Sequence, residues 1–422
     1  MDTPSPDLAT HRAVEAVWRI EAAKLIAGLT RITRDVGRAE ELASDALVVA
    51  LQHWPATGIP ANPGAWLMQT AKRRAIDEFR RAQRMARNLP ELTYAEELRE
   101  QETPDDATRL DDDVKDNVLS LIFTACHPVL GAEARAALTL RLVGGLTTAE
   151  IARAYLVPEP TIQQRIVRAK KTLAEAGVPF EVPRGADRAA RLGSVLEVLY
   201  LIFNEGYAAT AGANWMRTDL CDEALRVGRI LARLMHDEPE VHGLVALMEI
   251  QASRAAARTQ PDGTPILLLD QDRSRWNRIL IRRGLAALAE AEALGGARGP
   301  YALQAAIAAC HARAGKAGDT DWPRIARLYD ELAIVTPSPV VELNRAVAHA
   351  MAYGPEAGLR LLAPLADVPQ LRNYHLLPAV RGDLLEKLGR FDEARADFAR
   401  AADLAQNQRE RELMLTRAAG QA

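Results

Sequence analysis

Residues 147–173, "TTAEIARAYLVPEPTIQQRIVRAKKTL", restrict the fold of this chain more than any other segment. Thr147 and Glu150 have the Thr-x-x-Glu spacing of a capping box, in which the two side chains bond reciprocally to the first turn of a helix. That helix is short, because Pro158 and Pro160 in "LVPEP" are tolerated only at the start of a helix. The segment therefore predicts two helices joined by a turn, the second beginning near residues 158–160.

The second predicted helix has an apolar side and a polar side. With about 3.6 residues per turn, one side collects the core-facing residues Ile162, Ile166, Ala169 and Leu173. The opposite side carries Gln164, Arg168 and Lys171, with Thr161 near them and Gln163 and Arg165 on the flanks. Such a pair is typical of a helix-turn-helix, whose second helix enters the major groove and reads adenine with Gln and guanine with Arg. The alternative is an ordinary amphipathic hairpin with a solvated basic face.

A second basic helix is predicted over residues 66–87, where seven Lys and Arg residues accompany two acidic ones. Its inward stripe consists of Trp66, Leu67, Thr70, Ala71, Ala75 and Phe79, which leaves Lys72, Arg73, Arg80 and Arg81 on the outside. A single run of this kind is more often a solvated helix. Two basic helices in separate parts of one chain favour a protein that grips DNA at two places.

Composition predicts an all-α protein with several domains. The chain has 422 residues, is rich in Ala, Leu and Arg, which favour helices, and carries a net charge of −3, so any DNA-binding surface is local. Shifts in composition divide it into helical domains at 10–87 and 114–176, an acidic linker at 88–113 and a larger helical region at 187–422. Residues 91–113 contain ten acidic and two basic residues, a composition typical of a solvated segment.

The C-terminal region contains three successive pairs of predicted helices with Gly between them, at the ~35–40-residue spacing of tetratricopeptide-like (TPR-like) repeats. The last pair matches best, because Gly389, Phe391, Ala394 and Phe398 occupy its small and aromatic packing positions. An irregular helical bundle is the alternative. Within the same region, Asp270, Asp272, Arg273, Arg275 and Trp276 form a cluster in "DQDRSRWN", predicted to contact a ligand, a peptide or a polymerase, or else to form a buried ion-pair network.

Other functions lack their motifs. Three scattered Cys residues and isolated His residues predict neither disulfides nor a metal site and fit a reducing cytoplasm. No apolar run approaches the ~20 residues of a membrane span, and the N-terminus lacks a signal-peptide pattern. We find no phosphate-binding loop, dinucleotide fingerprint or nucleophile elbow, so we expect no cofactor and no enzyme.

The three N-terminal motifs together resemble bacterial RNA polymerase sigma factors of the extracytoplasmic-function type. Residues 38–54 resemble the segment that binds the polymerase clamp helices, residues 65–84 the helix that reads and opens the −10 promoter element, and residues 132–173 the helix-turn-helix that reads the −35 element. "LYLIFNEGYAAT", "LCDEALRVGRIL" and "LLLDQDRSRWN" are similar to a subgroup with a long, TPR-like C-terminal extension.

This resemblance implies a detachable subunit of the bacterial RNA polymerase core that recognises and melts promoter DNA. It assigns polymerase binding to Glu41, Leu42 and Asp45, and −10 contacts to Trp66, Lys72, Arg73, Arg74, Asp77, Arg80 and Arg81. It assigns −35 contacts to Thr161, Gln163, Gln164, Arg165, Arg168 and Lys171. It places the acidic linker in the RNA channel of the polymerase, with a plain tether as the alternative, and gives the extension a regulatory partner or ligand. The rival interpretation is a one-component helix-turn-helix regulator with a helical-repeat sensor.

Overall fold

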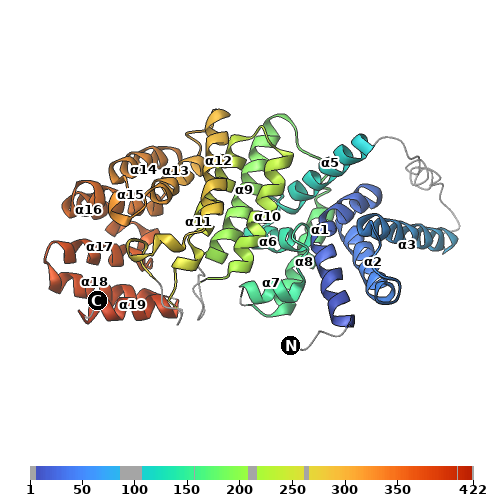
Figure 1. Ribbon diagram of the computed structural model, residues 1–422, viewed down its shortest axis with the longest axis horizontal. Coiled ribbons are helices and arrows are strands. Elements are labelled where there is room, and N and C mark those ends of the chain that lie inside the picture. The colour runs from blue at the N-terminus through green and yellow to red at the C-terminus, as the bar shows by residue number, and fades with distance from the viewer. Residues whose placement is uncertain are drawn as a thin grey trace. The chain divides into compact units, whose positions relative to one another are not determined.

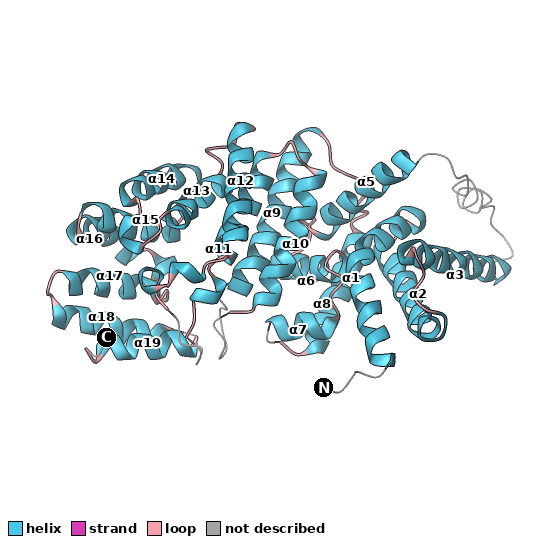
Figure 2. Cartoon of the chain, in the orientation of Figure 1, coloured by secondary structure: helices cyan, strands magenta, loops and turns pink. Residues whose placement is uncertain are grey.

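The computed structural model describes residues 6–85, 107–155, 157–207, 216–260, 266–405 and 407–420. Every regular element in these ranges is a helix, as the all-α prediction requires (Figures 1 and 2). The chain forms two compact units, residues 1–198 and 199–422. In the part that the structure describes, none of the helices is both long and apolar enough to cross a membrane.

The first three helices form one half of the N-terminal unit. They are α1 (Pro6–Thr33), α2 (Val36–Thr57) and α3 (Pro63–Met85), and α1 packs against both of the others. Asp35 caps α2 by accepting a hydrogen bond from the Arg38 backbone N–H at 2.9 Å. Pro55 lies inside the last turn of α2, which ends at Thr57, and the C-cap Gly58 has φ of +79°.

The other half of this unit contains α5 (Ala107–Ala125), α6 (Ala132–Leu142), α7 (Thr148–Tyr155), α8 (Glu159–Glu175) and the beginning of α9 (Gly185–Tyr207). The start of α5 at Ala107 corrects the predicted linker, whose last residues are helical; residues 88–106 lie outside the described ranges.

The beginning of α9 belongs to the N-terminal unit rather than to the C-terminal region predicted from residue 187. Ser194 Oγ donates a hydrogen bond to the Cys126 carbonyl at 2.6 Å, and Arg191 donates to the Phe123 carbonyl at 2.9 Å. These contacts fasten α9 to the end of α5. The two units accordingly divide within α9, after Val198.

The C-terminal unit is a succession of helices that pack on their neighbours in chain order. Its elements after α9 are α10 (Thr218–Leu234), α11 (Pro239–Ala252), η1 (Ala255–Ala257), η2 (Leu268–Asp270), η3 (Arg273–Arg275), α12 (Arg278–Ala293), α13 (Pro300–Arg313), η4 (Ala317–Asp319), α14 (Trp322–Val335), α15 (Pro339–Tyr353), α16 (Pro355–Leu362), η5 (Ala363–Asp367), η6 (Pro369–Leu371), α17 (Leu376–Lys387), α18 (Phe391–Leu404) and α19 (Gln408–Ala418). The three predicted helix pairs are α13 with α14, α15 with α16 and α17 with α18.

The last pair shows why the repeat pattern was readable in the sequence. Ala394 and Phe398 are buried at 2 % and 1 % exposure, and Gly389 ends α17 in the left-handed conformation with φ of +74°. Phe391 differs from the prediction, because it is the first residue of α18 and is 56 % exposed. Gly382 on α17 lets the Phe398 ring approach closely, since a Cβ atom at Gly382 would lie 3.0 Å from that ring.

Replacing Gly382 with Ala is expected to reduce the free energy of unfolding of the C-terminal unit by about 1–3 kcal/mol, the usual cost of overpacking. The Phe398 ring is 1 % exposed and has little room to move away. Gly318→Ala is the matched control, because no atom of the residues that the structure describes lies within 4 Å of a Cβ at that position. Urea unfolding of the full chain measures both variants, and equal midpoints would contradict the packing argument.

Candidate nucleic-acid interface

The capping box that opens the helix-turn-helix is present as predicted. The Thr147 backbone N–H donates to Glu150 Oε2 at 2.8 Å, and the Glu150 N–H donates to Thr147 Oγ1 at 3.1 Å. Glu150 also forms an ion pair at 2.7 Å with Arg19 of α1. Burial raises the pKa of Glu150, but the hydrogen bonds from Thr147 and the Arg19 charge outweigh burial and leave that pKa lowered. The carboxylate therefore stays ionised and holds the start of α7 in place.

The turn and the second helix also follow the prediction. Pro158 is the N-cap of α8, which begins at Glu159. The Thr148 hydroxyl donates to Glu159 Oε1 at 2.7 Å, which ties the start of α7 to the start of α8. The residues predicted to face the core, Ile162, Ile166, Ala169 and Leu173, are all buried. The orientation of α8 is thus fixed by its apolar side, and its polar side is left outward.

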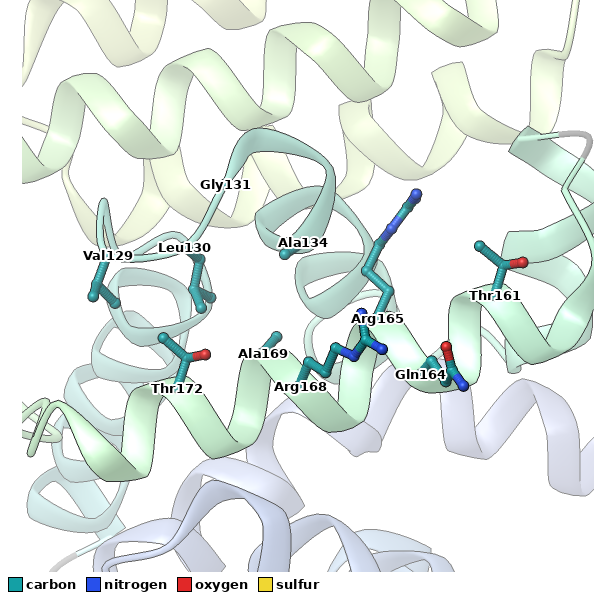
Figure 3. A pocket seen from close by; sticks show the side chains of 10 residues that line it. All are labelled: Val129, Leu130, Gly131, Ala134, Thr161, Gln164, Arg165, Arg168, Ala169 and Thr172. Carbon is teal, nitrogen blue, oxygen red and sulfur yellow. The ribbon is translucent and has the colours of Figure 1, made fainter.

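The outward side of α8 carries the predicted base-reading residues. Thr161, Gln163, Gln164, Arg168 and Lys171 are exposed, and Arg165 is half-buried. A hollow of about 330 Å³ lies beside α8, and Figure 3 shows Thr161, Gln164, Arg168 and Thr172 spaced along the helix at its edge. Its opposite wall consists of residues 129–131 and Ala134. Three of the predicted base-reading residues already have partners. Arg165 forms an ion pair with Glu133 at 2.5 Å and Lys171 one with Glu175 at 3.6 Å, and the Gln163 amide donates to Glu159 Oε1 at 3.3 Å.

The first basic helix, α3, presents fewer of its cations than the sequence predicts. Arg73 and Asp77 are exposed and Lys72 is half-buried. Arg74 forms an ion pair at 2.7 Å with Asp45 of α2. A residue predicted to contact DNA is therefore paired with a residue predicted to contact the polymerase. The side chains of Arg80 and Arg81 lie outside the described part of the structure.

Trp66 is placed by its packing against α2. Its ring meets the buried Trp54 ring edge-on, with centroids 5.3 Å apart and an interplanar angle of 63°. Trp54 is 2 % exposed, whereas Trp66 keeps part of its surface accessible. The aromatic pair sets where α3 begins relative to α2, and so where its outer face points.

The predicted polymerase contacts on α2 divide into surface and core. Glu41 is exposed and forms an ion pair at 2.7 Å with Arg38, and Asp45 is half-buried beside Arg74. Leu42 is 2 % exposed and packs in the core, so its side chain offers no surface to a polymerase. This corrects the prediction for Leu42. Its spacing of three and four residues from Ala39 and Ala46, which are both buried, would have placed Leu42 on the inward side of α2.

The sequence analysis missed a buried carboxylate that joins the two halves of this unit. Glu40 of α2 forms ion pairs with Arg141 of α6 at 2.5 Å and with Lys170 of α8. Burial raises the pKa of Glu40, but the charges of Lys170 and Arg141 outweigh burial and leave that pKa lowered. The signal that could have revealed Glu40 in the sequence is a charged residue at a position of α2 that faces the core. Its partners lie too far along the chain to be deduced from it.

The C-terminal "DQDRSRWN" residues do not form one cluster. Asp270, Asp272 and Arg275 are exposed, and Asp272 accepts a hydrogen bond from the Ser274 backbone N–H at 2.9 Å. Arg273 and Trp276 point inward and are 5 % and 3 % exposed. Among the described residues no ion pair joins these acids to these arginines, so the predicted ion-pair network is wrong.

Three family models match this chain. Sigma-70 region 2 matches residues 20–85, Sigma-70 region 4 matches residues 120–173, and a family of unknown function (DUF6596) matches residues 191–292. The uncharacterized protein R00370 of Rhizobium meliloti (strain 1021) is 46 % identical over 382 residues, covering 90 % of this chain and 89 % of that protein. The ECF RNA polymerase sigma factor SigL of Mycobacterium tuberculosis (strain H37Rv) is 34 % identical over 170 residues, covering 39 % of this chain and 91 % of SigL.

A helix-turn-helix that follows a separate three-helix segment with a basic outer helix defines a transcription factor with two DNA-contacting regions. The chain belongs to the extracytoplasmic-function sigma factors of RNA polymerase, because its N-terminal unit contains both sigma-70 regions and aligns with nearly all of SigL. It directs core RNA polymerase to promoters, and the family acts in initiation without being an enzyme. The extension of the chain beyond the sigma regions contains the match to the family of unknown function.

Proposed function

We propose that α8 reads the −35 promoter element in the major groove, that α3 contacts the −10 element, and that the exposed face of α2 binds the polymerase core. The observation that carries this proposal is the outward side of α8. Its amides and guanidinium groups have the donor and acceptor patterns that match base edges, while its buried side fixes the angle at which they are presented. Promoter recognition by this protein takes place in the cytoplasm, where the polymerase and the promoters are.

Run-off transcription with purified core polymerase tests this proposal. The full chain is expected to start RNA at new, defined sites, and a one-component regulator would bind DNA without conferring initiation. A truncated chain ending at Tyr207 is the informative companion, because it keeps the part of α9 that is bonded to α5. Absence of binding to the core polymerase by both chains would overturn the proposal.

The Glu40 ion pairs imply a change of arrangement on the promoter. The −10 and −35 promoter elements are about 25 base pairs apart, or ~85 Å at ~3.4 Å per base pair. A compact unit of this length has a radius of gyration of about 16 Å. One closed unit cannot reach both elements, so we propose that Glu40 leaves Arg141 and Lys170 when the protein engages its promoter.

Replacing Glu40 with Gln is expected to reduce the free energy of unfolding of the N-terminal unit by about 2 kcal/mol at neutral pH. This value lies below the range for a fully buried pair, because Arg141 and Lys170 each keep 21 % side-chain exposure. The folded pKa of Glu40 is lowered, so its contribution is present above the ordinary value of 4.5 and is lost as the pH falls through the folded value. Urea unfolding at neutral and acidic pH measures this, and a difference that persists in acid would contradict it.

We propose that the helix pairs of the C-terminal unit hold a regulatory partner or ligand of this sigma factor. The support is architectural, since stacked helix pairs present extended surfaces suited to binding. Comparing transcription by the full chain and by the chain ending at Tyr207 tests this proposal. Identical promoter output under all growth signals would overturn a regulatory role.

A further inference from the structure

Three arginines of the C-terminal unit converge on two aromatic rings. The guanidinium carbons of Arg254 and Arg273 lie 5.5 Å and 5.1 Å from the centre of the Trp276 ring. Those of Arg254 and Arg258 lie 6.0 Å and 3.5 Å from the centre of the Tyr207 ring. Arg258, Arg273 and Trp276 are at most 5 % exposed, so this is an interior cluster rather than a surface patch. We call these five residues the arginine cluster.

In the described part of the chain, Arg254 and Arg273 donate their hydrogen bonds to neutral groups. Arg254 donates to the Gln251 and Gln271 side-chain oxygens at 2.9 and 3.4 Å. Arg273 donates to the backbone carbonyls of residues 311 and 314 at 2.8 and 2.9 Å and to the hydroxyl of residue 320 at 3.0 Å. In the described part of the chain, no carboxylate lies within 4 Å of Arg254 or Arg273. Asp319 acts on Arg273 only from a longer distance.

Keeping a positive charge in a protein interior is costly. Burial lowers the pKa of Arg258 and of Arg273, and the positive charge of Arg254 lowers both further. Burial and the same neighbouring arginines lower the pKa of His311 to about 4, so that ring is neutral at pH 7. Cation–π contacts offset part of the cost but do not neutralise the charge. A protein that keeps several cations together in its interior gains stability from an anion placed among them.

Several buried nitrogen atoms of the same region have no hydrogen-bond partner among the described residues. They are Trp276 Nε1, Arg273 Nε and His311 Nδ1, and the three residues are 3 %, 5 % and 7 % exposed. The first two are N–H donors, and the third is a donor in one tautomer of the neutral ring. Buried donors are nearly always bonded in native proteins. These nitrogen atoms lie beside the guanidinium groups of Arg254 and Arg273, which have no carboxylate within 4 Å in the described part of the chain, and this grouping points to a negatively charged acceptor.

We propose that the arginine cluster binds the oxyanion group, a carboxylate or a phosphate, of a small molecule. Guanidinium groups and an indole N–H donate to such oxygens with matching geometry. The cluster draws on three separate segments, around residues 207, 254–258 and 273–276, which the fold alone brings together. Its binding site makes the C-terminal unit a sensor of an anionic compound, a role beyond promoter recognition.

Thermal unfolding of the full chain provides the first test. Inorganic phosphate and citrate are added separately, and chloride at the same ionic strength corrects for general salt effects. At about 100 times its dissociation constant, the bound anion is expected to raise the melting temperature of the C-terminal unit by about 5 °C or more. A rise with phosphate alone identifies a phosphate ligand, and a rise with citrate alone a carboxylate. No rise with either anion overturns the proposal.

Two variants locate the site by calorimetric titration with the anion that stabilises. Arg254→Gln, which removes one cation, is expected to weaken binding at least about tenfold, in line with a hydrogen bond to a charged group. Trp276→Phe keeps the buried ring but removes the N–H, and is expected to weaken binding about fivefold. Arg282→Gln, at an exposed arginine of α12, is the matched control and is expected to bind as the parent does.

Equal affinity of the parent, Arg254→Gln and Trp276→Phe would show that the anion binds elsewhere and would overturn the proposal. If Arg254→Gln fails to fold, Trp276→Phe alone decides, because that variant removes no charge. These assays contain neither DNA nor polymerase. Their failure therefore leaves the promoter-reading role of α8 untouched, and a failure of promoter recognition leaves the anion site untouched.

Discussion

Replacing both Gln164 and Arg168 with Ala will lower transcription from promoters that depend on the −35 element by at least about 30-fold. Each residue is exposed on the outward side of α8, and in the described structure neither forms an ion pair. A good bidentate contact to a base is worth about 1–3 kcal/mol, so losing two costs about 2–6 kcal/mol. Run-off transcription and gel-shift titration on matched promoters measure the loss, which is expected in binding rather than in the rate after the complex forms.

The controls for this double variant separate base reading from general charge. Arg282→Ala removes an exposed arginine outside the sigma regions and is expected to leave transcription unchanged. Arg165→Ala is expected to have a smaller effect than the double variant, because Arg165 is already paired with Glu133 at 2.5 Å. A double variant that retains the affinity and base preference of the parent at every promoter position would disprove the role of α8.

The sequence predicted those parts of the interface that are set by neighbours along the chain. A capping box needs residues three apart, and the buried side of α8 needs only helical spacing, so both were readable at residues 147–173. The three C-terminal helix pairs were readable for the same reason. The exposure of Gln164 and Arg168 followed from the burial of Ile162 and Ile166 on the other side.

The parts that were missed depend on residues far apart in the chain. No local pattern pairs Arg74 with Asp45, or Glu40 with Arg141 and Lys170, because those contacts exist only after helices have packed. Likewise, neighbouring residues of "DQDRSRWN" separate into exposed acids and an inward Arg273 and Trp276, since extended backbone at Gln271 and Asp272 divides two short 3-10 turns. The sequence therefore singled out only Arg273 and Trp276 of the arginine cluster and gave no sign of Tyr207, Arg254 or Arg258.

Replacing Trp54 with Ala is expected to reduce the free energy of unfolding of the N-terminal unit by about 4–6 kcal/mol. Trp54 is among the largest fully buried side chains of the described structure, and truncating such a residue costs about 3–5 kcal/mol. Its edge-on contact with Trp66 adds about 0.5–1.5 kcal/mol. Because the ring also fixes α3 against α2, promoter opening is expected to be lost at temperatures where the unit is still partly folded.

Trp54→Phe is the matched control, and it distinguishes shape from hydrogen bonding. Trp54 Nε1 is buried and has no hydrogen-bond partner among the described residues, so removing its N–H relieves an unsatisfied donor while losing only part of the ring volume. The cost of Trp54→Phe is therefore expected to be about 1–2 kcal/mol. Urea unfolding, monitored by circular dichroism, should show the unfolding transition of the N-terminal unit shifted and that of the C-terminal unit unchanged. If Trp54→Ala leaves the unfolding transition of the N-terminal unit and promoter opening as in the parent, the tryptophan pair does not position α3. Other contacts would then hold the basic face of α3.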